Sequence, residues 1–157
     1  MTLSITYSLT GAGWSRCSLT FADQTCNISA SYLSDALGNL ILSALGMMQG
    51  YGSMAFGFDE EPGEYRWVIR RIDGNTMNLR ILEFPQLWGN EPDSAGEELM
   101  NIELPIEDYA KAVEQVADSL FTEHGESDYL NKWVEHAFPT DLLALLKQSF
   151  PKPPNAA

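Results

Sequence analysis

Two histidines and two cysteines are the side chains best suited to catalysis, and neither pair stands in a catalytic pattern. His124 and His136 each follow a glutamate, but adjacent residues point to different sides of a helix, so neither pair forms a site by itself. Cys17 and Cys26 alternate with polar neighbours and have no partners at metal-ligand spacing, so we interpret both as small buried hydrophobes. The chain also contains no phosphate-binding, dinucleotide-binding, nucleophile-elbow or zinc-protease motif. We therefore predict no catalytic residue, no metal site and no cofactor.

Acidic residues gather in the second half of the chain, next to an aromatic residue. The stretch from Glu91 to Asp108 holds seven acidic residues and no basic one, and it closely follows Trp88. An aromatic side chain beside a charged loop is typical of an interface anchor. We predict that five residues of this expected loop bind a partner: Trp88, Glu91, Asp93, Glu97 and Glu98. The alternative is that the acids are simply solvated and that Trp88 covers the end of a sheet.

Four of the nine basic residues lie close together, at Arg66, Arg70, Arg71 and Arg80. Arg66 and Arg70 fall on one face of an expected strand, and Arg80 on its neighbour can lie on the same side. Pairing with acids of the same chain across the strands is the favoured interpretation. The alternative is a patch that binds a carboxylate-rich partner.

The net charge of −13 restricts the classes of partner. It disfavours nucleic acid and anionic membranes, both of which attract clustered lysine and arginine. It favours solubility and rapid capture of a basic partner. Since the chain shows neither a secretory signal nor an apolar run of about 20 residues, we expect a cytoplasmic protein.

Hydrophobic periodicity predicts the elements that must position these residues. Alternation of two indicates strands at 3–10, 14–21, 25–32, 53–58, 64–72 and 76–84, and a short strand-like run at 99–104. Helical spacing indicates helices at 36–48, 105–124, 127–136 and 141–150. The expected fold is α+β: an antiparallel sheet of about five to six strands in hairpin–helix–hairpin order, with helices packed on it and a helical C-terminus. We expect one domain over 1–150 and a frayed, proline-rich tail over 151–157.

A family resemblance rests on this order of elements and on two short segments. The segments are Tyr32-Leu33-Ser34-Asp35, which leads into the first helix, and the strand Glu64-Tyr65-Arg66-Trp67-Val68. Over roughly residues 3–124 the chain resembles small bacterial proteins of unassigned role and immunity proteins of contact-dependent growth-inhibition systems. The resemblance implies a cytosolic α+β protein that binds and blocks a toxin domain, and it assigns no binding residues.

Three functions from different classes remain open at this point. The leading hypothesis is an immunity or inhibitor protein that neutralises a basic protein toxin, such as a nuclease, through an acidic surface. The second is a self-associating structural protein that uses the apolar 36–48 helix, with Met47 and Met48 exposed. The third is an unrecognised hydrolase that uses carboxylates and His136.

Overall fold

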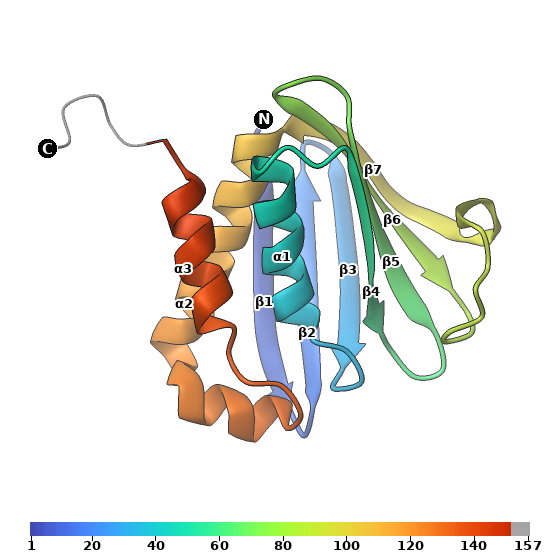
Figure 1. Ribbon diagram of the computed structural model, residues 1–157. Coiled ribbons are helices and arrows are strands. Elements are labelled where there is room, and N and C mark those ends of the chain that lie inside the picture. Colours follow the sequence, from blue (N-terminus) through green and yellow to red (C-terminus); the bar gives the residue numbers. More distant parts are fainter. Residues whose placement is uncertain (152–157) are drawn as a thin grey trace, which may run out of the picture.

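The protein is an α+β structure of two antiparallel sheets and three helices, described over residues 1–151 by a computed structural model (Figure 1). Most of the expected 151–157 tail lies outside the described residues. In chain order the elements are β1 (Ser4–Gly11), β2 (Trp14–Phe21), β3 (Gln24–Ser31), α1 (Ala36–Met48), β4 (Ser53–Asp59), β5 (Glu64–Arg71), β6 (Thr76–Phe84), a 3-10 turn (Asp93–Ala95), β7 (Glu97–Pro105), α2 (Ile106–Trp133) and α3 (Thr140–Ser149).

The expectation of one sheet of five to six strands was wrong. Within residues 1–151 there are seven strands, divided into a three-stranded sheet in the order β1-β2-β3 and a four-stranded sheet in the order β4-β5-β6-β7. Both are meanders of sequential antiparallel strands, as the tight turns predicted. The division falls where α1 separates β3 from β4, because these two strands form no backbone ladder with each other.

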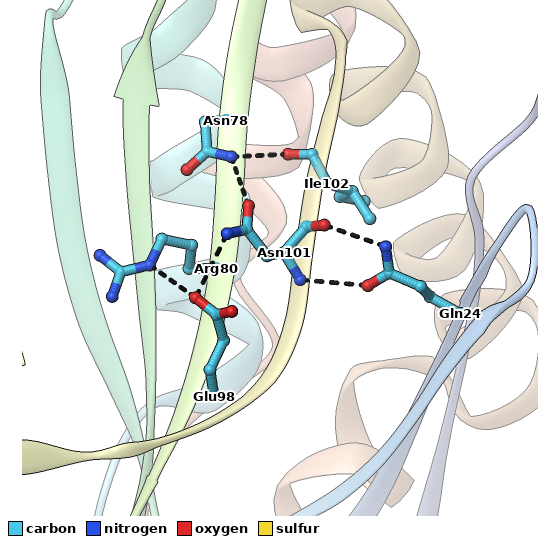
Figure 2. Close-up of polar contacts among 6 residues, drawn as sticks. All are labelled: Gln24, Asn78, Arg80, Glu98, Asn101 and Ile102. Atoms are coloured by element: carbon cyan, nitrogen blue, oxygen red, sulfur yellow. Dashed lines mark hydrogen bonds and ion pairs between the residues drawn. The ribbon is translucent and has the colours of Figure 1, made fainter. Parts of the chain in front are cut away.

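Side-chain hydrogen bonds from β3 join the two sheets at both ends of that strand. At its start, the Gln24 amide donates to the carbonyl of Asn101 in β7 at 3.0 Å and accepts from the Asn101 N–H at 3.2 Å (Figure 2). At its end, the Ser31 hydroxyl donates to the carbonyl of Asp59 in β4 at 2.9 Å. Both outer strands of the four-stranded sheet are therefore attached to β3, which leaves less of their edges unpaired.

Aromatic residues form the centre of the four-stranded sheet's inner face. Trp67 is fully buried and shares its face of β5 with Tyr65 and Ile69. Its ring stacks on Phe56 at 5.3 Å and lies 5.1 Å from Phe58, and Phe58 meets Tyr7 of the other sheet edge to face at 6.4 Å. Such pairs add to the free energy gained from burial and fix how the two sheets pack.

The first helix is buried on most sides, because α2, α3 and β4 all pack against it. Asp35 caps it by accepting from the Gly38 N–H at 3.1 Å. Met47 is buried, so the expectation that it is exposed for self-association was wrong, whereas Leu42 is exposed. At the helix end, the Arg71 guanidinium donates to the carbonyl of Met47.

The second helix is bent where the sequence predicted a break. Gly125 has a φ of 67° inside α2, which separates the helical segment before it from the segment that carries Tyr129 and Trp133. Left-handed backbone favours glycine, since it has no Cβ to clash. The bend turns Tyr129 and Trp133 into the core, where both are fully buried.

A buried hydrogen bond between α1 and α2 generates the first prediction. The Ser43 hydroxyl donates to the Leu40 carbonyl at 2.7 Å, so it accepts from the Tyr109 hydroxyl, also at 2.7 Å. Ser43→Ala leaves the fully buried Tyr109 hydroxyl without a partner, and we expect the free energy of unfolding in urea to fall by about 1–3 kcal/mol. Adding Tyr109→Phe to that variant removes the orphaned group and should restore part of the loss. An additive second loss would contradict the assignment.

The two cysteines are buried free thiols on adjacent strands of the three-stranded sheet. Cys17 faces Ile28 and Cys26 faces Leu19, so the cysteines are diagonal neighbours. Diagonal neighbours lie about 7–8 Å apart, and a disulfide needs a Cβ separation of about 4 Å. The backbone geometry therefore holds them apart.

Burial also makes these thiols inert, which is the second prediction. Burial, followed by the nearby Glu83 carboxylate, raises the pKa of Cys26 to about 11, and burial raises the pKa of Cys17 further still. The thiolate is the reactive form, and at pH 8 both groups are protonated in the folded state. We expect slow reaction with a disulfide reagent at pH 8 and fast reaction of two thiols per chain in denaturant. Rapid labelling of the folded protein would refute this.

Candidate protein-binding surface

Two acidic turns of the four-stranded sheet lie side by side. One is the β4–β5 turn at 59–64, and the other is the connection at 86–96 between β6 and β7. The Leu87 N–H donates to the Pro62 carbonyl at 2.7 Å, and the Trp88 indole N–H donates to the Asp59 carboxylate at 3.3 Å. We call residues 59–64 and 86–96 together the paired acidic turns.

Trp88 stands on this surface in an unusual conformation. Its side chain is 66% exposed, and its φ is 58°; Asn90 nearby has a φ of 54°. Asparagine tolerates left-handed backbone through its short polar side chain, but a bulky residue there is strained. Strain of this kind persists only where the surroundings hold the segment in place, and it occurs often at binding sites.

The group that holds the segment is the Arg66 guanidinium, which reaches out from β5. It donates to the Glu91 carbonyl at 2.8 Å, to Asp93 Oδ1 at 2.9 Å and to Glu64 Oε1 at 3.2 Å. Its central carbon also lies 4.1 Å from the centroid of the Phe84 ring. A planar guanidinium can donate several hydrogen bonds in one plane and stack on an aromatic ring at the same time. A lysine ammonium group has no such plane.

The same segment covers an apolar patch on the outer face of the sheet. Leu82 and Phe84 are almost fully buried, although they lie outside the main core cluster. Gly96 passes directly over them: a Cβ at Gly96 would lie 2.7 Å from the Phe84 ring and 3.1 Å from Leu82. Apolar contact below and the guanidinium beside it fix the position of the connection.

The structure divides the five predicted binding residues into two groups. Trp88 and Glu91 are exposed in the paired acidic turns, and Asp93 lies there too but is bonded to Arg66. Glu97 and Glu98 were expected in a loop, but they form the start of β7. Both are exposed, as residues of a loop would be.

Glu98 is part of a polar network on the outer face of the sheet (Figure 2). Its carboxylate accepts from Arg80 Nε at 3.1 Å and from the Asn101 amide at 3.2 Å, and Asn78 donates to the Asn101 amide oxygen at 2.7 Å. Arg80 lies opposite Val68 and so shares the face of Arg66, as predicted. Arg80 is paired with an acid across the strands, as the favoured interpretation expected. Arg66 is also paired with acids of its own chain, but these are Glu64 of the same strand and Asp93 of the connection.

Sequence reasoning missed three residues of this surface: Gly57, Asp59 and Glu64. Asp59 and Glu64 had been assigned only to a turn and a strand end. An isolated glycine inside an apolar strand often marks a bulge or a close approach, and Gly57 carried that signal.

The histidines are placed away from this surface. His124 Nδ1 lies 2.7 Å from Asp128 Oδ2, and this hydrogen bond, with the nearby Lys132, lowers the pKa of Asp128. His136 lies half-buried between α2 and α3 and makes no side-chain hydrogen bond to the described residues. Within residues 1–151 no group of three potential ligands is placed to hold a metal ion, and no helix has the length and apolar character to cross a bilayer.

Comparison with protein-family models, with curated proteins and with solved structures found no match to the chain.

The third prediction concerns Arg66. We expect Arg66→Gln to increase hydrogen–deuterium exchange of the 87–96 amides, because the Glu91 carbonyl and Asp93 lose their donor. Arg66→Lys should fail to restore protection, since a lysine keeps the charge but lacks the fork.

Arg70→Gln is the matched control, because Arg70 is exposed on the same strand and the same face. Its exchange should equal that of the unchanged protein. Unaltered exchange in Arg66→Gln would show that the remaining contacts of the segment, not the guanidinium, hold it.

Proposed function

We propose that this protein binds and inhibits a basic protein through the paired acidic turns, with Trp88 as the apolar anchor. The observation that carries the proposal is a two-thirds exposed tryptophan, held in a strained backbone by surrounding contacts and bordered by carboxylates. A rigid, exposed aromatic residue with a charged rim has the composition of a binding hot spot. Leaving such a side chain in water is costly unless a partner covers it.

The distribution of charge supports a cationic partner. The chain has 22 acidic and 9 basic residues. Within residues 1–151, five of the bases form ion pairs with acids of the same chain: Arg66, Arg80, Lys111, Lys132 and Lys147. The excess of negative charge is therefore left on the surface. Such a field accelerates encounter with a basic protein and repels polyanions.

A toxin is the partner class that fits the resemblance described above. A cytosolic immunity protein has to bind a toxin domain faster than the toxin reaches its target. A nuclease toxin presents a cationic site for its own substrate, and an acidic surface mimics that substrate's charge. We therefore propose a cytoplasmic immunity role.

Self-association through α1 is the weaker alternative, because Met47 is buried and Leu42 alone of that helix's large side chains is exposed. Light scattering distinguishes the two: an isolated monomer disfavours self-association.

The fourth prediction tests the proposed function with Trp88→Ala. The product of the adjacent gene is co-expressed with this protein, and the affinity is measured by calorimetry at low and at physiological salt. We expect Trp88→Ala to weaken binding by about 30-fold, corresponding to the roughly 2 kcal/mol of a hot-spot residue. Binding should also weaken as salt rises.

Tyr51→Ala is the matched control, since Tyr51 is 60% exposed at the α1–β4 connection. It should bind as the unchanged protein does. An adjacent product that is not basic and does not bind at low salt would overturn the immunity proposal. An equal loss of affinity in both variants would show that Trp88 is not the anchor of the interface.

A further inference from the structure

A hollow of about 260 Å³ lies beside Trp88 on the outer face of β4 and β5. Gly57, Glu64, Arg66, Trp88 and Asn90 are among the residues that line it. The hollow therefore has an indole at its rim, a strand at its floor, and in its wall a carboxylate together with the Arg66 guanidinium bonded to it.

The floor of the hollow is open because residue 57 is a glycine. Gly57 lies in the interior of β4, opposite Arg66, and its φ is not in the left-handed region, so the backbone itself does not require glycine. Glycine weakens a strand, and in such a position it often marks a place that a ligand or another chain approaches closely. The missing side chain is thus an independent sign of an occupant.

Two carboxylate oxygens point at the space that a side chain at 57 would fill. The Cβ of an alanine there would lie 3.3 Å from Glu64 Oε2 and 3.5 Å from Asp59 Oδ1. Glu64 uses its other oxygen for Arg66, and Asp59 uses its other oxygen for the Trp88 indole. Within residues 1–151, neither Glu64 Oε2 nor Asp59 Oδ1 accepts a hydrogen bond.

The local charge is negative even after Arg66 is counted. Arg66 lines the hollow and pairs with Glu64 and Asp93, and Asp59 is a third acid that pairs with no cation of the described residues. An apolar or neutral side chain in the hollow would desolvate the two free oxygens without replacing their hydrogen bonds from water. A cationic side chain would replace them with charge-assisted bonds.

We propose that the hollow over Gly57 receives one arginine side chain of the basic partner. Its guanidinium donates to Glu64 Oε2 and Asp59 Oδ1, and its plane lies against the Trp88 indole. A guanidinium supplies several donors in one plane together with a face that stacks on aromatic rings, whereas a lysine ammonium supplies a point charge. This inference rests on the proposed function and names the chemical group of the partner that the surface recognises.

The experiment uses a short blocked peptide with one central arginine as the probe, and a matched peptide in which neutral citrulline replaces the arginine. The readout is the indole N–H signal of Trp88 in a ¹⁵N spectrum at low salt, identified by its loss in Trp88→Phe. We expect a saturable shift of this signal with the arginine peptide, and at least fivefold weaker binding of the citrulline peptide. A lysine peptide should bind with an affinity between the two.

Gly57→Ala places a methyl group on the floor of the hollow, against the two free oxygens, where the guanidinium would lie. The fold should tolerate it, because its nearest contacts are the ends of two flexible carboxylate side chains and because alanine is better tolerated than glycine in a strand. We expect it to abolish the arginine-dependent shift and to leave stability unchanged or raised. Gly52→Ala, just before β4, meets open space and is the matched control that should bind as before. Equal binding of arginine and citrulline, or undiminished binding by Gly57→Ala, would overturn the inference.

The outcomes separate this inference from the proposed function. If Trp88→Ala loses the protein partner and Gly57→Ala keeps it, the surface is right and the arginine hollow is wrong. If the arginine peptide binds the unchanged protein and not Gly57→Ala, but the adjacent gene product does not bind, the hollow is right and the immunity role is wrong.

Discussion

The hydrogen bonds of one guanidinium, that of Arg66, determine the shape of the candidate surface. They connect the start of β5 to a carbonyl and a carboxylate from a segment about 25 residues further along the chain. Because the group is only partly exposed, water competes weakly for these bonds, and the neighbouring Phe84 ring limits its movement. Together with the Leu87–Pro62 and Trp88–Asp59 bonds, this attachment surrounds Trp88, whose left-handed backbone is uncommon for a bulky residue and persists where neighbouring contacts hold it.

Two other arginines are also bonded to groups of the same chain. Arg71 donates to the carbonyls of Met47, Tyr51 and Gly74, and so fastens the end of α1 to the β5–β6 hairpin. Arg80 is bonded to Glu98 on the neighbouring strands. The chain has few basic residues, and several of them bond to groups of the chain itself. The acidic residues outnumber them, so the excess is left without a basic partner at the surface. The same intramolecular bonds therefore stabilise the fold and leave the surface negatively charged.

Much of the fold was predictable because its signals are local. The alternation of apolar and polar residues predicted six of the strands, and a break was predicted between residues 124 and 127, where α2 bends at Gly125. The number of sheets was not predictable, since it depends on whether the edges of β3 and β4 form a ladder, and no local pattern encodes that. The start of β7 was missed because Glu97 and Glu98 are exposed and polar, as loop residues also are. Trp88 was predicted as a binding residue from its charged neighbours in the sequence. Its hydrogen bond to Asp59 joins residues 29 positions apart, and no local sequence pattern indicates it.

The attachment of β3 to both outer strands has a consequence for the order in which the chain is made. The three-stranded meander precedes its partners in the chain: α2, which packs against β1, begins only at Ile106, and Gln24 meets its partner at Asn101. Until those residues are synthesised, the apolar face that carries Tyr7, Cys17 and Ile28 has no cover from α2. We therefore expect the three-stranded sheet to complete its packing late, after about 80 further residues have been added.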